Sequence, residues 1–265
     1  MTMQWSGRSI ALAAVLAIAS AAMAREPAGP AGYLAVSAFD ILAVLPPAPK
    51  PDDARGTTDR AIFRTTRAFA GTTRWEMATN DVKLSPADMM RDYSCAVGIS
   101  LTPEIAPRTA ALVRRAAFDT ARGTGIAKDF YKRERPFRYD SGPTCQPQQE
   151  LAGSYDYPSG HTTLGWTWAM LLTKLVPDRA TPILARGRAF GESRIVCGVH
   201  NLSAVEAGRL SATVTLAAVE QTSDFQTDLA AAKTEIAGLR ADPATPRPDA
   251  DQCRLEAQLV AQKIF

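Results

Sequence analysis

The stretch that decides the fold reads Pro158-Ser-Gly-His-Thr-Thr-Leu-Gly-Trp-Thr-Trp-Ala-Met-Leu-Leu-Thr-Lys-Leu-Val176. From Thr162 onward it is rich in Leu, Trp and Met and carries no charge before Lys174, which is typical of a largely buried helix. Ser159 and Gly160 precede this run, so their backbone N–H groups are expected at a helix N-terminus, where anions bind well. The sequence therefore predicts a central helix with an anion site at its start.

Two further blocks lie on either side of this helix in the sequence. They read Lys128-Asp-Phe-Tyr-Lys-Arg-Glu-Arg135-Pro136 and Ser193-Arg194-Ile-Val-Cys-Gly-Val-His200-Asn-Leu-Ser-Ala204. Phosphoryl transfer places negative charge on three equatorial oxygens, and arginine forks match such oxygens two at a time. The predicted phosphate-binding residues are Lys128, Arg135, Ser159, Gly160 and Arg194.

Both histidines of the chain, His161 and His200, also fall in these blocks. An unprotonated imidazole can attack phosphorus, while a protonated one can donate a proton to the leaving oxygen. A single histidine is more often a structural group, but two histidines among this many anion-binding side chains indicate a catalytic pair. The blocks together predict a phosphate site with a nucleophile and an acid.

The order Lys-x6-Arg-Pro, Pro-Ser-Gly-His and Ser-Arg-x5-His resembles the PAP2 (phosphatidic acid phosphatase type 2) superfamily, most closely its secreted bacterial class A non-specific acid phosphatases. The segment Tyr93-Ser-Cys-Ala-Val-Gly-Ile-Ser100 also looks like that family. The resemblance implies that His200 is the nucleophile, that His161 is the general acid, and that the residues named above bind phosphate. It implies hydrolysis of phosphate monoesters through a phosphohistidine, without a metal or another cofactor.

One position departs from the family pattern. After the nucleophilic histidine the family continues with three residues and then an aspartate that accepts a hydrogen bond from it, and this chain has Ala204 at that position. Glu206 is two residues further along a helix and should face elsewhere, with Ser203 and Glu206 forming a capping box. A distant carboxylate such as Asp81 or Asp92 is an open alternative.

The loss of that aspartate leaves three interpretations open. The first is an active acid phosphatase, and the second is a phosphate-ester or oxyanion-binding homologue that no longer turns over. The third is a vanadate-dependent haloperoxidase, whose vanadate site resembles this phosphate site, although the chain is short for those enzymes. A membrane lipid phosphatase is disfavoured because, beyond the N-terminus, no stretch is expected to approach 18 apolar residues.

The N-terminus has the pattern of a secretory signal peptide over residues 1–24. Arg8 precedes an apolar run from Ile10 to Ala19, and Ala22-Met-Ala24 offers small residues for cleavage. We expect a periplasmic or secreted protein in which residues 25–265 form one domain, with its motif core over residues 128–204.

The net charge and the cysteine content indicate which partners and which disulfides to expect. A net charge of +3 with scattered basic residues argues against binding to nucleic acid or, once the signal is removed, to a membrane. The expected partners are small phosphate monoesters, and the number of subunits, a homo-oligomer included, is left open. Four cysteines in an exported chain predict two disulfides, with three pairings open, among Cys95, Cys145, Cys197 and Cys253.

The remaining segments predict an all-α fold, a compact helical bundle around the three blocks. Strand signals are nearly absent, and helical patterns recur from Thr57 to Phe265. Gly123-Thr-Gly125 is expected to break one helix, so that Lys128 and Arg135 share one face of a short new helix.

Overall fold

The structure is a computed structural model that describes Met1, residues 32–36 and residues 38–265. The described part of the chain consists of helices and loops without a strand, which confirms the all-α prediction. The predicted signal peptide lies outside the described residues, apart from Met1. The α-helices are α1 (Ile41–Val44), α2 (Ala54–Thr66), α3 (Thr73–Asn80), α4 (Pro86–Val97), α5 (Pro107–Tyr131), α6 (Gly160–Leu175), α7 (Ala180–Val196), α8 (Leu202–Val219), α9 (Ser223–Ala241) and α10 (Ala250–Ala261).

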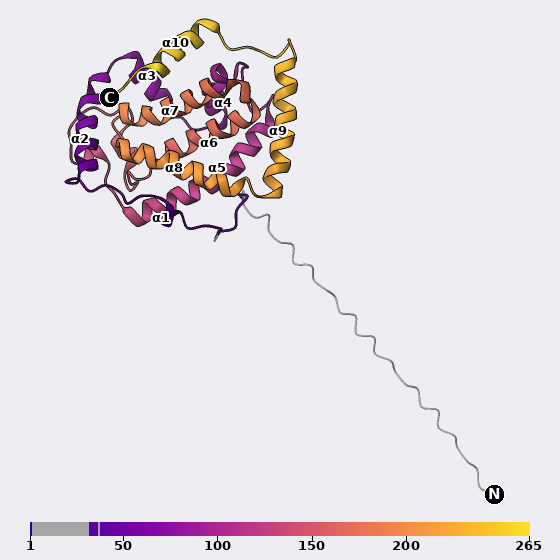
Figure 1. Cartoon of the computed structure of the whole chain (residues 1–265), viewed down its shortest axis with the longest axis horizontal. Coiled ribbons are helices and arrows are strands. Elements are labelled where there is room, and N and C mark those ends of the chain that lie inside the picture. Colours follow the sequence, from indigo (N-terminus) through magenta and orange to yellow (C-terminus); the bar gives the residue numbers. More distant parts are fainter. Residues whose placement is uncertain (2–31, 37) are drawn as a thin grey trace.

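Helix α6 is the centre of the bundle, as its apolar sequence predicts. It packs against α5, α7 and α8, and Figure 1 shows it enclosed by these helices. Gly165 allows α7 to come close, because a Cβ at this position would lie 2.4 Å from the ring of Phe190. Trp168, Leu171 and Leu172 are buried in the same core, so the helix is held on most of its faces.

Helix α5 is longer than the sequence predicts. It continues through Gly123 and Gly125 and ends only at Tyr131, where Lys132 takes a left-handed conformation as the C-cap. Glycine costs about 1 kcal/mol relative to alanine inside a helix, and packing of α5 against α6, α8 and α9 outweighs that cost here. The predicted break and the predicted short helix shared by Lys128 and Arg135 are therefore wrong.

Two other boundaries differ from expectation. The helical pattern expected over Thr57 to Ala78 is divided into α2 and α3, because Thr72 caps a new helix by accepting a hydrogen bond from the backbone of Trp75. Helix α8 begins after Asn201 rather than at a Ser203 capping box. The side chain of Ser203 pairs with Asp59 instead.

One described helix, α8, is long and apolar enough to cross a membrane by length and composition. The expectation that no later stretch approaches 18 apolar residues is therefore wrong. Of its 18-residue window, 56% is buried inside the protein, and it packs along α5 and α6. Core helices commonly show this combination of apolar sequence and burial.

Two disulfides form, as predicted. Cys95 in α4 pairs with Cys253 in α10, which ties the C-terminal helix to the bundle. Cys145 pairs with Cys197, which joins the loop between α5 and α6 to the end of α7. The second bridge lies among residues of the three sequence blocks.

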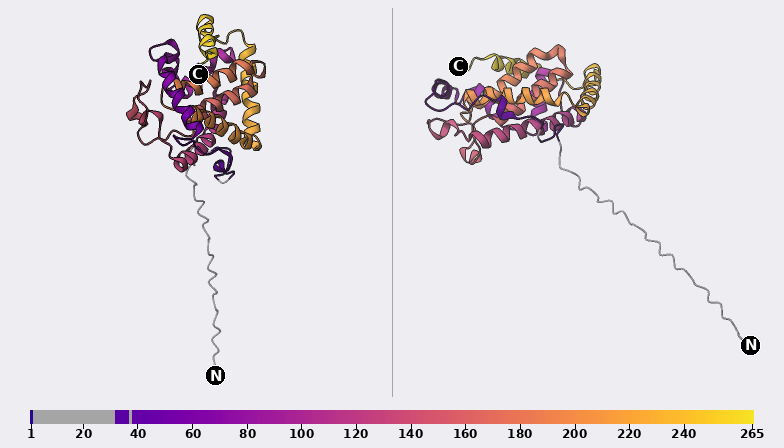
Figure 2. Two further views of the ribbon diagram at one scale, coloured as in Figure 1. Left: turned by 60° about the vertical axis from the view of Figure 1, so that its left-hand side comes forward. Right: turned by 60° about the horizontal axis from the view of Figure 1, so that its bottom comes forward.

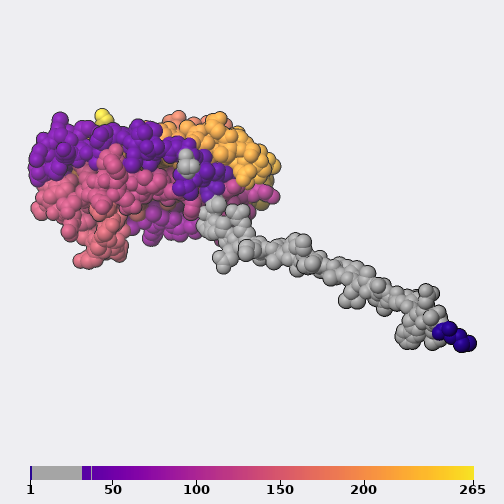
Figure 3. Space-filling model, turned by 90° about the horizontal axis from the view of Figure 1, so that it is seen from below, coloured from indigo at the N-terminus to yellow at the C-terminus, as the bar shows by residue number. Residues whose placement is uncertain are grey.

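Four helix ends meet at one end of the bundle. The C-terminal ends of α5 and α7 come together there with the N-terminal ends of α6 and α8, while α9 closes the opposite end (Figures 1 and 2). Figure 3 shows the outer surface of the shared end, where the indigo segment that includes α2 and the rose segment between α5 and α6 form the surface. The three sequence blocks occupy these helix ends.

Candidate active site

The N-terminus of α6 carries the middle block. Ser159 is the N-cap, and its Oγ accepts hydrogen bonds from the backbone and the hydroxyl of Thr162. The backbone N–H of Ser159 donates to the carbonyl of Ala204 at 2.9 Å, so it is not directed at an anion as the sequence suggested. The first amides of the helix, those of Gly160 and His161, lie at the positive end of the helix dipole.

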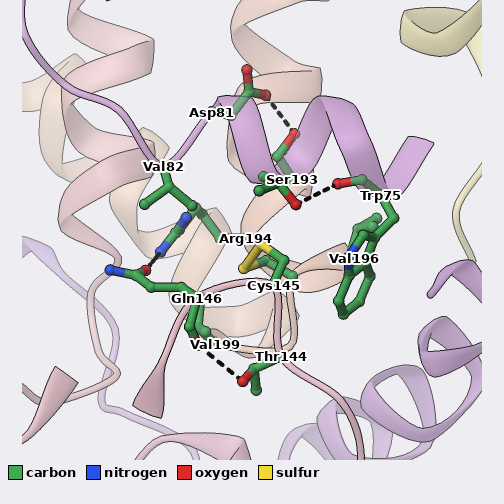
Figure 4. Close-up of a disulfide and its surroundings, with 12 residues drawn as sticks. Trp75, Asp81, Val82, Thr144, Cys145, Gln146, Ser193, Arg194, Val196 and Val199 are labelled. Carbon is green, nitrogen blue, oxygen red and sulfur yellow. Dashed lines mark hydrogen bonds between the residues drawn. A yellow bond between two sulfur atoms is a disulfide. The ribbon is translucent and has the colours of Figure 1, made fainter. Parts of the chain in front are cut away.

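Arg194 is fully buried in the last turn of α7. Its Nη2 donates to Oε1 of Gln146 at 2.8 Å (Figure 4), whereas its Nε and Nη1 have no hydrogen-bond partner among the described residues. Burial and the nearby Arg135 lower the pKa of Arg194 to about 9. A buried guanidinium with two free donors is costly to fold, and an oxyanion would satisfy it.

The loop that holds Gln146 is fixed by the disulfide beside it. Cys145 is bonded to Cys197, and the backbone N–H of Cys145 also donates to the carbonyl of Cys197 at 3.0 Å. Figure 4 shows the bridge next to Arg194 and Gln146. The disulfide therefore keeps Gln146 next to the guanidinium of Arg194.

Lys128 and Arg135 reach the same place from different segments. Lys128 extends from the last turn of α5 over the start of α6, where its Cε lies 4.0 Å from a Cβ built on Gly160. Its Nζ donates to the carbonyl of Tyr155. Burial and the charge of Arg135 lower the pKa of Lys128 to about 7. The guanidinium of Arg135 donates to both oxygens of Ser154.

His200 lies in the tight connection between α7 and α8. The backbone amides of Val199 and His200 both donate to the carbonyl of Arg194. A single backbone turn therefore separates His200 from the buried Arg194. Gly198 permits this turn with a φ of +75°, and a Cβ there would lie 2.3 Å from Nη1 of Arg67. The side chain of His200 is 1% exposed.

Both ring nitrogens of His200 have partners. Nδ1 lies 2.8 Å from Oδ1 of Asp156, and Nε2 lies 2.9 Å from Nη1 of Arg135. Burial and the surrounding cations lower the pKa of His200 well below its ordinary value. The imidazole is therefore neutral at neutral pH.

Asp156 is the site residue that sequence reasoning missed. It is the one acidic residue between Glu150 and Asp178, two positions before Pro158, and that isolated charge beside the middle block was the available signal. The suggested alternatives are wrong: Asp81 binds Arg186 and Ser193, and Asp92 binds Asn80.

His161 occupies the first turn of α6. Its Nε2 lies 3.1 Å from the carbonyl of Val82, which can only accept, so Nε2 carries a proton. Its Nδ1 makes no hydrogen bond within the described residues. Burial and the charge of Arg194 lower the pKa of His161 well below its ordinary value.

The site is thus built from three basic side chains, a helix N-terminus and two imidazoles. All seven side chains or backbone groups predicted from the sequence lie at the shared helix ends, although the Ser159 amide is used elsewhere. The described residues hold no group of three or more His, Cys, Asp or Glu that could bind a metal. The positive charge of the site comes from Lys128, Arg135 and Arg194.

Comparison with known proteins shows the family of the chain. Residues 110–227 match the model of the PAP2 superfamily. An acid phosphatase of Zymomonas mobilis is 39% identical over 82% of this chain and 82% of its own length. Non-specific acid phosphatases of Providencia stuartii and Salmonella typhimurium are 35% and 34% identical, covering 77% and 72% of this chain and 83% and 78% of their own lengths. The chain belongs to the PAP2 superfamily and is a homologue of these acid phosphatases.

Proposed function

We propose that the protein is an acid phosphatase that hydrolyses a broad range of phosphate monoesters through a phosphohistidine, without a metal. The observation that carries this proposal is the neutral, buried His200 with three cations around it. The three cations can bind a phosphate dianion next to His200, whose neutral imidazole can act as the nucleophile. The relatives' names and the family match support the reaction class.

Substrate binding would satisfy the two donors of Arg194 that have no protein partner among the described residues. The free Nε and Nη1 of Arg194 would donate to two phosphate oxygens, as a guanidinium fork does. Lys128 and Arg135 would contribute further charge, and the amides of Gly160 and His161 would add the helix N-terminus. Arg135 would exchange its contact with Nε2 of His200 for a phosphate oxygen, which frees the nucleophile.

In the first step, Nε2 of His200 attacks phosphorus as the bond to the leaving oxygen breaks. His161 donates a proton to that oxygen, so an alcohol leaves and His161 becomes neutral. The cations and helix amides stabilise the charge on the three equatorial oxygens in the transition state. The product is a phosphoryl group bonded to His200.

In the second step, His161 accepts a proton from water, and the water oxygen attacks phosphorus. The phosphorus–nitrogen bond breaks, its electron pair returns to Nε2 of His200, and phosphate is released. The two histidines thus return to their starting states after one turnover.

We also propose a periplasmic or secreted location. The disulfides Cys95–Cys253 and Cys145–Cys197 are typical of oxidising compartments. The signal-peptide pattern of residues 1–24 supports the same placement.

The pH dependence of aryl phosphate hydrolysis tests this function. His161 must be protonated, and its pKa in the free site is lowered by burial and Arg194, so kcat/KM should fall as pH rises through that low pKa. A bound dianion offsets Arg194 and raises the pKa, so the decline of kcat should lie at higher pH. Both profiles should be measured with a chelator present.

A second aryl ester with a different phosphate pKa serves as the control. A decline caused by the ester itself would move with that pKa, whereas one caused by His161 would not. No turnover at any pH between 4 and 8, or turnover that requires an added metal, would contradict the proposed function.

A further inference from the structure

We propose that Asp156 is the positioning residue for His200, so that a carboxylate before the middle block replaces the one that the family has at position 204. This inference rests on the proposed function, because it assigns the group that orients the proposed nucleophile. It also explains how the site can work with Ala204. The carboxylate comes from a different segment of the chain but meets the same imidazole.

The contact with Arg135 decides which ring nitrogen of His200 carries the proton. A guanidinium has donors and no acceptor, so Nε2, at 2.9 Å from Arg135 Nη1, must offer its lone pair. A neutral imidazole with a bare Nε2 carries its proton on Nδ1. That proton then points at Oδ1 of Asp156, 2.8 Å away. The tautomer with a nucleophilic Nε2 is therefore the one that the surroundings select.

Asp156 is itself fixed by donors on both of its oxygens. The backbone N–H of Asn201 donates to Oδ1 at 3.2 Å, the side-chain amide of Asn201 donates to Oδ2 at 2.8 Å, and Arg133 lies 3.3 Å from Oδ2. Burial raises the pKa of Asp156, while Arg133 and Asn201 act to lower it. The hydrogen-bond donors around Asp156 require an acceptor at this position, and an ionised carboxylate provides one.

A second carboxylate anchors this arrangement without touching the histidine. Asp59 accepts from Nη2 of Arg133 at 2.7 Å and from the backbone of Ser203 at 2.9 Å. Asp59 and Asp156 are both fully or nearly fully buried, and both pair with Arg133. Asp59 therefore offers a matched control, a buried carboxylate of similar structural importance that does not contact His200.

Position 204 has a different task in this chain. Ala204 is fully buried in a small cluster with Tyr157 and Ala207, and its carbonyl accepts from the backbone of Ser159. Its side chain packs against the residue that follows Asp156. The segment with Ala204 and the segment with Asp156 therefore pack against each other.

The test compares Asp156→Asn with Asp59→Asn. Neutralising the orienting carboxylate of serine proteases lowers turnover about 10⁴-fold by favouring the wrong tautomer, and we expect a loss of 10³-fold or more in kcat for Asp156→Asn on the same scale. Inhibition by inorganic phosphate should change little, because the cations remain. Asp59→Asn should retain kcat within about tenfold, since it leaves the His200 contact in place. Equal losses of kcat in the two variants would overturn the proposal.

Nitrogen NMR of the histidine rings gives a readout that needs no turnover. The chain has only two histidines, so untagged, ¹⁵N-histidine-labelled protein gives two ring systems, assigned with a His161→Gln variant. Wild-type His200 should show the proton on Nδ1, and Asp156→Asn should shift it toward Nε2. A proton on Nε2 in the wild type would overturn the proposal even if the variant did not fold. A flat hydrolysis assay with the expected tautomer would instead count against the proposed function alone.

Discussion

His200→Ala is expected to reduce kcat for aryl phosphate hydrolysis by on the order of 10⁶-fold, the loss seen when a covalent nucleophile is removed from a serine hydrolase. The reason is that His200 is the proposed nucleophile, with Nε2 facing Arg135 and Nδ1 held by Asp156, whereas His161 is the proposed proton donor. Phosphate binding should persist, since Arg194, Lys128 and Arg135 are unchanged. Steady-state kinetics and the inhibition constant of inorganic phosphate measure the two quantities separately.

A labelling experiment identifies the intermediate in the same pair of proteins. Rapid quenching of wild-type enzyme with a ³²P-labelled monoester should leave label on the protein, stable in base and lost in acid, as a phosphohistidine is. His200→Ala should remain unlabelled, and His161→Ala, with the nucleophile intact, serves as the matched control that can still be labelled by an ester with a good leaving group. Label on the His200→Ala protein would contradict the assignment.

Arg194→Met should have the next largest effect: it should lower the activity and raise the stability of the protein. Removal of one preorganised oxyanion donor lowers turnover about 10²- to 10³-fold in other enzymes, and Arg194 supplies two donors and a charge, so we expect at least about 10³-fold in kcat/KM on that scale. The free energy of unfolding without ligand should rise by about 1 kcal/mol, because a buried charge with two free donors is removed. Phosphate should no longer raise the melting temperature.

Arg186→Met is the matched control for this prediction. Arg186 is nearly as deeply buried as Arg194, but its guanidinium is paired with Asp81 at 2.7 Å. Removing one partner of a buried ion pair commonly costs about 3–5 kcal/mol, so this variant should be much less stable. If Arg194→Met were destabilised as strongly as Arg186→Met, Arg194 would be a structural residue rather than a phosphate ligand.

The centre of the fold follows from the sequence because its signals are local. The apolar run after His161 has to be buried, and Ser159 marks its start, so α6 could be placed within two residues at its N-terminal end. The three blocks are local as well, and the structure brings them together because four helices end at the same place. The end of α5 could not be placed, because two glycines suggested a break that tertiary packing overrides.

Asp156 shows where the sequence is insufficient. Its contact with His200 joins positions 44 residues apart, and such a pair has no periodic or spacing signal. The family pattern pointed to position 204, where Ala204 suggested a lost function. Only the fold shows that the loop before Pro158 lies against the loop after Cys197. The missing carboxylate was therefore present in the chain but outside the expected block.

Hydrolysis of an aryl phosphate by the wild type, Ala204→Asp and His200→Ala side by side tests the central claim most directly. We expect wild-type turnover far above the His200→Ala blank, and no gain in Ala204→Asp, because Asp156 already holds His200 and Ala204 lies in a fully buried apolar contact. A wild type no faster than the blank, with activity appearing only in Ala204→Asp, would contradict the account and identify a phosphate-binding protein that has lost turnover.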